Sequence, residues 1–139
     1  MNIDPIWLPC SALVLVTALV WINLYADRLG EMRKKGINPQ SLATARVAAG
    51  KLENTQAADN FRNLFEVPVL FYLLCVAIAI TGGSTPGLLL AAWIFVGLRA
   101  LHSLIHVSYN RVMHRFLAYA ASTLLLFGMW AVFLQRILQ

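Results

Sequence analysis

Charged residues are scarce in this sequence, and their scarcity excludes an ordinary soluble domain. Asp, Glu, Lys and Arg make up 12% of the 139 residues, while 60% of the residues are hydrophobic. An ordinary soluble domain is about a quarter charged, so an integral membrane protein is expected. Four spans of roughly 20 residues each, joined by short connections, account for nearly the whole length. The sequence therefore predicts a single domain over residues 1–139.

Cysteine is rare, and the first apolar run lacks acidic residues. The two cysteines, Cys10 and Cys75, lie far apart within apolar runs, where thiols more often behave as small hydrophobic groups than as metal ligands. No acidic residue occurs between Asp4 and Asp27. A small four-span drug exporter is expected to place its key acid in the first span near the midplane. That function is therefore a disfavoured alternative.

Lys and Arg are absent before the first apolar run and from residues 82–87 (GGSTPG), and they gather in residues 26–60. This asymmetry indicates that residues 26–60 lie in the cytoplasm and that both termini face outward. The formal net charge of +5 then reflects topology rather than a nucleic-acid partner, because no basic motif with interleaved aromatic residues is present. A compact chain without targeting extensions favours a bacterial inner membrane.

The apolar runs predict an all-α, up-down-up-down four-helix bundle in the membrane. Residues 82–87 form an uncharged tight turn, which makes the second and third spans a helical hairpin. Pro68 cannot donate to the carbonyl of Leu64, so the second span is expected to bend there and to free backbone acceptors. The predicted spans are about 6–25, 61–81, 88–107 and 115–138.

Polar side chains interrupt the start of the second span. Residues 59–74 read DNFRNLFEVPVLFYLL, and in a continuous helix Arg62, Asn63 and Glu66 share one face. Ionisable side chains in a membrane helix face the bundle interior or a wet cavity, and by default they indicate a functional site. These three residues are therefore candidate site residues at the cytoplasmic end of the span.

The third and fourth spans add further polar residues at a similar depth. Arg99, His102 and His106 follow one another at i, i+3 and i+7, which places them in one stripe on one helix face. Arg115 opens the fourth span on the same side of the membrane. We expect three spans to converge on one polar pocket in the cytoplasmic half of the bundle.

The predicted pocket contains more arginines than acids. Uncompensated positive charge at membrane depth is unfavourable, so the surplus favours a small anionic ligand that enters from the cytoplasm. The alternative is a structural ion pair between Glu66 and either Arg62 or Arg99, which would merely hold the helices together. No metal is expected between His102 and His106, because the adjacent arginines would repel a cation.

Two motifs resemble those of the MAPEG family, the membrane-associated proteins in eicosanoid and glutathione metabolism. They are RNLFE at residues 62–66 and RALHSLIHVSYNRVMHR at residues 99–115, and the resemblance covers nearly the whole chain. The family includes microsomal glutathione transferases, leukotriene C synthase and prostaglandin E synthase. The prostaglandin E synthase branch has an Arg, a His three residues on, a Tyr seven on and an Arg sixteen on. The corresponding residues here are Arg99, His102, His106 and Arg115.

The resemblance implies a homotrimer that binds glutathione between neighbouring subunits near the cytoplasmic face. Arg115 would lie over the sulfur and stabilise the thiolate, which would then attack a lipophilic electrophile. The implied function is a membrane-bound, glutathione-dependent transferase with glutathione as co-substrate. The implied glutathione-binding residues are Arg62, Asn63, Glu66, Arg99, His102 and His106, and Tyr109 is added because it is close to them in the sequence.

Three positions depart from the family pattern. Asp59 stands where the family has an arginine, His106 replaces the tyrosine of the third span, and Val67 replaces the tyrosine that follows the glutamate in leukotriene C synthase. A non-catalytic membrane assembly protein of the same fold therefore stays an alternative. It would keep the trimer and lose the thiolate-stabilising role, and a direct glutathione-binding measurement distinguishes the two.

Overall fold

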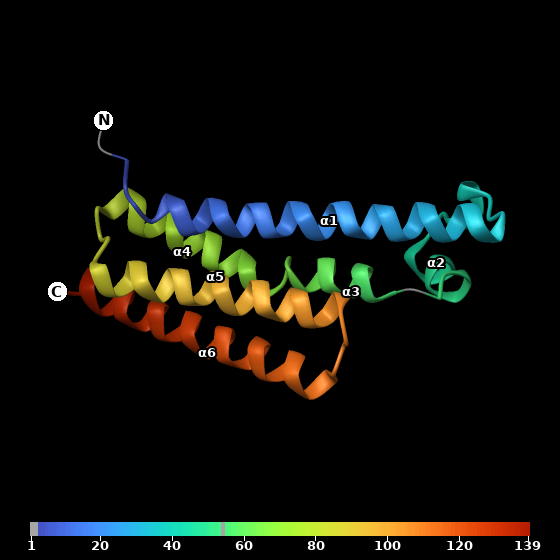
Figure 1. Cartoon of the computed structure of the whole chain (residues 1–139). Coiled ribbons are helices and arrows are strands. Elements are labelled where there is room, and N and C mark those ends of the chain that lie inside the picture. Colours follow the sequence, from blue (N-terminus) through green and yellow to red (C-terminus); the bar gives the residue numbers. More distant parts are fainter. Residues whose placement is uncertain (1–2, 54) are drawn as a thin grey trace.

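The computed structural model describes residues 3–53 and 55–139, and every regular element within these ranges is helical. The all-α prediction is therefore confirmed for this part of the chain. Figure 1 shows long helices lying side by side, with both termini at one end of the bundle. The elements are α1 (Trp7–Lys35), the 3₁₀ helix η1 (Pro39–Leu42), α2 (Ala45–Lys51), α3 (Gln56–Asn63), α4 (Val67–Thr81), α5 (Pro86–Val107) and α6 (Val112–Ile137).

Four segments within the described residues are long and apolar enough to cross a membrane. Many of their large hydrophobic side chains are exposed on the outside of the bundle, where lipid rather than water would surround them. The four segments are Trp7–Lys35, Gln56–Thr81, Pro86–Val107 and Val112–Ile137.

Helix α1 continues well beyond the predicted span and projects past α5 and α6 (Figure 1). Its 29 residues correspond to a length of about 44 Å, whereas the hydrocarbon core of a bilayer is about 30 Å thick. Arg33, Lys34 and Lys35 occupy the last turn, where positive charge interacts favourably with the carbonyl end of the helix. Gly36 ends the helix with φ 62°, a left-handed conformation that glycine adopts without steric penalty.

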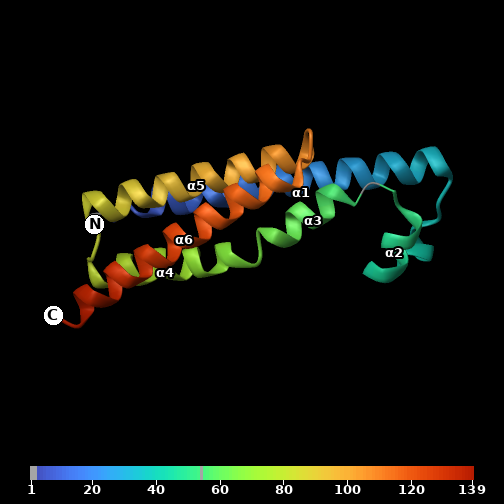
Figure 2. The ribbon, with the colours of Figure 1, turned by 90° about the horizontal axis from the view of Figure 1, so that it is seen from below.

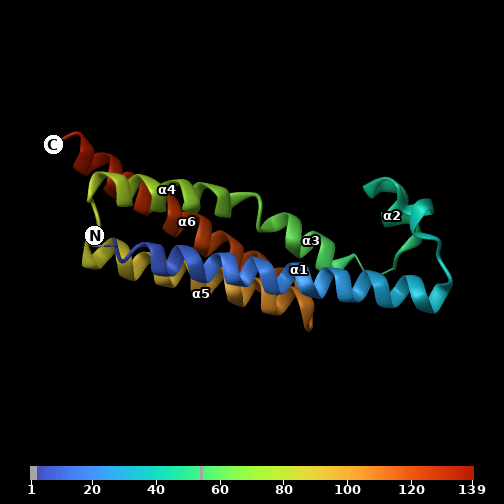
Figure 3. The ribbon, with the colours of Figure 1, turned by 90° about the horizontal axis from the view of Figure 1, so that it is seen from above.

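The second span is interrupted rather than merely bent. The sequence predicts one continuous helix, but α3 ends at Asn63 and α4 begins at Val67 (Figures 2 and 3). Pro68 lies in the first turn of α4, where a missing amide donor is tolerated. Glu66 precedes α4 and has non-helical backbone angles. The prediction that Arg62, Asn63 and Glu66 share one helical face is therefore wrong.

The apolar core occupies the half of the bundle nearer the termini. Phe71 of α4 stacks on Phe95 of α5 with ring centroids 4.5 Å apart, and both side chains are fully buried. Around them pack Leu13 of α1 and Leu126 of α6. The buried polar residues of α5 lie in the other half of the bundle, so the packing separates an apolar end from a polar end.

The asymmetry of basic residues gives a testable prediction for orientation. Gly87 is exposed beside the turn between α4 and α5, with space for a side chain, whereas Lys34 is exposed at the opposite end of the bundle. We expect Gly87→Cys to react with an impermeant thiol reagent added to intact cells and Lys34→Cys to stay unlabelled. Cys10 and Cys75 are buried and should give little background. The reverse labelling pattern would place the polar end of the bundle outside the cell.

Candidate functional site

Arg99 lies at the centre of the polar end and is fully buried. Its Nη2 donates to the backbone carbonyl of Asn63 at 2.8 Å. In a continuous helix that carbonyl would accept from the amide of Val67, so the break between α3 and α4 leaves it available to the arginine. The guanidinium carbon also lies 5.3 Å from the centre of the Tyr119 ring, within the range of a cation–π contact.

Arg99 uses only part of its hydrogen-bonding capacity. Within residues 3–53 and 55–139, its Nε and Nη1 have no hydrogen-bond partner, although both atoms are buried. A buried donor without an acceptor is unfavourable, and in native proteins it usually marks a bound water, an ion or a ligand position. Arg99 therefore keeps two buried donors that no described residue satisfies.

Arg115, half-buried in the first turn of α6, is held by residues of α5 and of the α5–α6 connection. Its Nη1 donates to Oδ1 of Asn110 at 2.7 Å and lies 3.1 Å from Nε2 of His106. Its carbonyl oxygen lies 3.0 Å from Nδ1 of His102. Both the backbone and the side chain of Arg115 are thus fixed against α5.

These contacts assign the hydrogen positions on the two histidines. A guanidinium only donates, so Nε2 of His106 accepts and its proton is on Nδ1. A carbonyl only accepts, so Nδ1 of His102 donates. The remaining ring nitrogens, Nε2 of His102 and Nδ1 of His106, are buried and have no partner among the described residues. At the polar end, Arg99, His102 and His106 therefore each keep at least one buried hydrogen-bonding atom that no described residue satisfies.

The structure brings together four of the predicted site residues, and Asn63 contributes through its carbonyl. We call this set the arginine–histidine cluster; it consists of Arg99, His102, His106 and Arg115.

The other predicted residues lie outside this cluster. Arg62 has a side chain that is 69% exposed and lies 3.8 Å from the carboxylate of Asp59. Glu66 is exposed, and within the described part of the chain it forms no ion pair with Arg62 or Arg99. Neither of the two ion pairs expected as the structural alternative is therefore formed among the described residues, and Glu66 lies at the interruption of the second span, where its backbone is non-helical.

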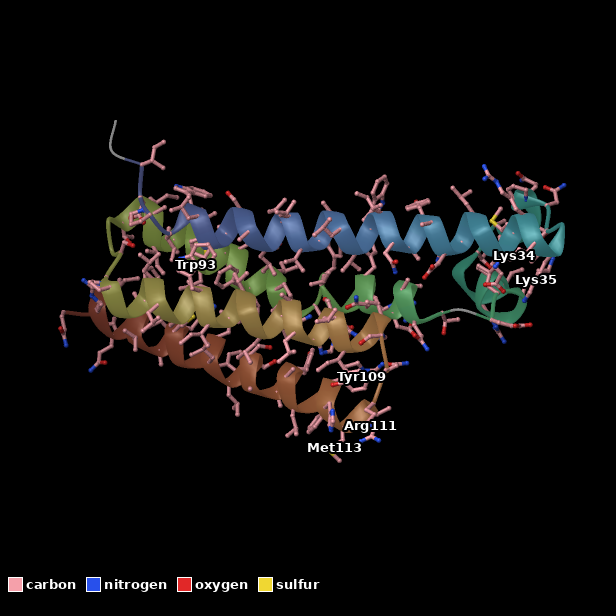
Figure 4. The ribbon with its side chains drawn as sticks, viewed as in Figure 1. Lys34, Lys35, Trp93, Tyr109, Arg111 and Met113 are labelled. Carbon is pink, nitrogen blue, oxygen red and sulfur yellow. The ribbon has the colours of Figure 1, made fainter. Side chains whose placement is uncertain are left out.

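Tyr109 also points away from the cluster. It lies in the connection between α5 and α6 (Figure 4), is 58% exposed, and pairs its hydroxyl with Nδ1 of His114 at 3.1 Å. Within the protomer, Tyr109 therefore lies at the surface and outside the arginine–histidine cluster, and its place in a glutathione site stays a prediction. Its proximity in sequence did not indicate its side-chain direction, which depends on how α5 ends.

Several residues near the cluster were not predicted from the sequence. Asn60 is fully buried and accepts a hydrogen bond from Oγ of Ser103 at 3.0 Å, which joins α3 to α5 beside Arg99. Tyr119 lies under the Arg99 guanidinium, and Asn110 holds Arg115. A polar residue within or next to an apolar span is the signal that could have identified Asn60, whereas Tyr119 and Asn110 have no comparable pattern.

A groove runs along the outside of the bundle between α1 and α3. Its volume is about 400 Å³, and aromatic side chains form much of its wall. Arg62 borders this groove, whereas Arg99 is buried inside the bundle. The two arginines therefore lie in different places within one protomer. The lining residues are Trp21, Leu24, Tyr25, Arg28, Ala58, Phe61, Arg62 and Phe65.

Comparison with known families identifies the chain. The model of the MAPEG family matches residues 6–135, nearly the whole length. The chain belongs to the MAPEG family. It is therefore a multi-pass membrane protein of the family of glutathione and eicosanoid metabolism, and the resemblance carried by the two sequence motifs is confirmed at the level of the family. Searches among curated proteins and solved structures gave no significant match.

Proposed function

We propose that this MAPEG protein is a glutathione-dependent transferase in which Arg115 stabilises the glutathione thiolate for attack on a lipophilic electrophile. The observation that carries the proposal is the arginine–histidine cluster, whose two guanidinium groups lie at the polar end without a carboxylate partner among the described residues. Charge of this kind at membrane depth requires compensation, and a bound anion supplies it.

Glutathione has the groups that this cluster lacks. It carries two carboxylates, one ammonium group and one thiol, so its carboxylate oxygens can accept from the unused Nε and Nη1 of Arg99. Its thiol loses a proton more readily beside a cation, because the cation favours the charged form and lowers the thiol pKa. Arg115 is only half-buried, so its guanidinium can be reached by a ligand that enters from outside the protomer.

The reaction needs few further groups. The thiol proton passes to solvent, and the thiolate attacks an electrophilic carbon of the second substrate. A carbon–sulfur bond forms while the bond to a leaving group such as chloride breaks, and the leaving group departs with its electron pair. The protein's contribution is to hold the thiolate in a region of low dielectric, where one cation has a larger effect than at a water-exposed surface.

The exposed residues Arg62 and Glu66 are assigned to glutathione binding across a subunit interface. Both side chains point outward from the protomer, where a neighbouring copy can bring its own cluster close to them. Arg62 then faces a glutathione carboxylate and Glu66 its ammonium group or an amide. This assignment requires a homotrimer, the assembly implied by the resemblance.

The assembly prediction can be checked directly. We expect native mass spectrometry of the protein in mild detergent to show a trimer as the main species. In one protomer, Arg62 and Glu66 are exposed, whereas the unused donors of the arginine–histidine cluster are buried at another place. A second copy is therefore needed to bring the two sets of residues to one glutathione molecule. A spectrum of only monomers, or of antiparallel dimers, would remove the shared site and would revive the exporter alternative.

Calorimetric titration with reduced glutathione tests the proposed function itself. We expect saturable binding to the detergent-solubilised protein, and we expect Glu66→Gln to weaken it by about tenfold because one charged ligand group then loses its partner. Glu53→Gln is the matched control, since Glu53 is also exposed but pairs with Lys35 at the far end of α1. The absence of any glutathione binding to the wild-type protein would favour the non-catalytic assembly protein.

A further inference from the structure

The connection between α5 and α6 contains an unusual backbone conformation at Asn110. Asn110 has φ 48°, and within residues 3–53 and 55–139 it is the only residue other than glycine with positive φ. Its amide donates to the carbonyl of Ile105 at 2.9 Å, which closes the end of α5. Asparagine tolerates the left-handed region better than most residues, so this position suits the residue that occupies it.

The turn at Asn110 brings its side chain to Arg115. Its Oδ1 accepts from Nη1 of Arg115 at 2.7 Å, the shortest contact that the arginine makes in the described structure. The same Nη1 lies 3.1 Å from Nε2 of His106. One guanidinium nitrogen is therefore held between an amide oxygen and an imidazole nitrogen, and both partners belong to α5 or its connection.

Both acceptors are uncharged, and this matters for the arginine's charge. A carboxylate in place of the amide would hold the guanidinium equally well but would neutralise it, and a neutral ion pair stabilises a nearby thiolate poorly. Without any acceptor, a long arginine side chain at a helix end extends to the polar interface instead of staying inside the bundle. An amide oxygen fixes the direction of the guanidinium and leaves its full charge available.

We propose that Asn110 is a positioning residue that holds the Arg115 guanidinium inside the bundle, where it faces the glutathione thiolate. This inference rests on the proposed function. Asn110 acts through Arg115 and does not itself touch the substrate. The left-handed turn and the side-chain hydrogen bond serve the same end, because the turn directs Oδ1 toward the first turn of α6.

Two substitutions at this position separate its roles. Asn110→Gly keeps the positive φ, which glycine adopts freely, and removes the shorter of the two acceptors of Arg115 Nη1, while Nε2 of His106 remains. Asn110→Asp keeps the shape and the acceptor but adds a negative charge. Asn38→Gly is the matched control, because Asn38 also uses its Oδ1 as an acceptor in a connecting segment, for the amide of Gln40, far from Arg115 along the chain.

The experiment measures kcat and KM with reduced glutathione and chlorodinitrobenzene, together with the thiolate absorbance of bound glutathione at neutral pH. We expect Asn110→Gly to lower kcat and the thiolate absorbance by about threefold to tenfold, with KM for glutathione changed by less than about twofold. Asn110→Asp should lower the thiolate absorbance as well, whereas Asn38→Gly should match the wild-type protein. A purely structural role for Asn110 predicts that the aspartate variant keeps the thiolate.

The double variant Asn110→Gly with Arg115→Ala decides whether Asn110 acts through the arginine. We expect it to have the same kcat as Arg115→Ala alone, because there is then no guanidinium left to hold. Additive losses in the double variant, or wild-type behaviour of Asn110→Gly beside an impaired Arg115→Ala, would overturn the positioning role only. Full activity of Arg115→Ala would overturn the proposed function, and the positioning role with it.

Discussion

Replacing Arg115 by alanine is expected to lower turnover with glutathione and chlorodinitrobenzene by about tenfold or more, while the affinity for glutathione changes by less than about threefold. One adjacent cation lowers a thiol pKa by about one to two units, which raises the thiolate fraction at neutral pH roughly tenfold or more. Removing the cation reverses this gain, but the contacts that bind the rest of the tripeptide remain. Steady-state kinetics and calorimetry separate the two effects.

Arg111→Ala is the matched control for this prediction. Arg111 precedes α6 and is exposed (Figure 4), so its removal changes the net charge of the same region without touching the arginine–histidine cluster. We expect Arg111→Ala to keep wild-type turnover. If Arg115→Ala also keeps full turnover, the role assigned to Arg115 is wrong, and His102 or His106 becomes the next candidate for activating the sulfur.

The second large effect is expected at Arg99, where the substitution Arg99→Met should weaken glutathione binding by about tenfold or more. Methionine fills a similar buried volume but offers no donors, so the ligand carboxylate loses its partner. Arg99 has no ion-pair partner among the described residues, so the change leaves no carboxylate unpaired, and its cost to stability should be mainly the lost bond to the Asn63 carbonyl. Calorimetry and the thermal unfolding temperature measured on the same sample test both statements.

Arg136→Met provides a control with the same chemistry at the opposite end of the bundle. Arg136 donates from Nη1 to the carbonyl of Gly83 at 2.7 Å, which resembles the bond from Arg99 to the carbonyl of Asn63 at 2.8 Å. Arg136 is exposed, so water can replace its bond and its loss should cost less stability than the loss of the buried Arg99, but only Arg99→Met should lose glutathione. Equal glutathione affinity in the two variants would assign Arg99 a purely structural role.

The arrangement of the helices follows from features that are local in the sequence. Apolar runs of sufficient length predict membrane helices because the backbone must satisfy its hydrogen bonds internally. The spacing of Arg99, His102 and His106 places them in one stripe of any regular helix, and α5 is regular over this stretch. These residues are buried together because α5 places its polar stripe toward the bundle interior and its apolar side chains toward lipid.

The details of the second span could not be derived in the same way. Pro68 predicts a missing hydrogen bond, but it does not reveal whether the helix bends and continues or ends and begins again. The chain ends α3 at Asn63, and the freed carbonyl is taken by Arg99, a residue 36 positions later in the sequence. That partner lies on another helix, so the position of Glu66 depended on packing that no local pattern contains.

The directions of side chains in the α5–α6 connection were equally inaccessible. Tyr109 and Asn110 are adjacent in the sequence, yet Tyr109 pairs with His114 at the surface while Asn110 turns inward to Arg115. The difference arises from one residue with positive φ, and several residue types can occupy such a turn. Sequence spacing therefore indicated the region of the arginine–histidine cluster but not which of these two neighbours contacts Arg115.

The central claim, that Arg115 stabilises a bound glutathione thiolate, is tested most directly by ultraviolet difference absorbance. Thiolates absorb at about 240 nm and thiols do not, so the signal reports the ionised sulfur without requiring an electrophile. We predict that adding glutathione to the wild-type protein at neutral pH produces this absorbance, that Arg111→Ala retains it, and that Arg115→Ala loses most of it. An undiminished thiolate signal in Arg115→Ala, or no signal in a wild-type protein shown to bind glutathione, would contradict the account.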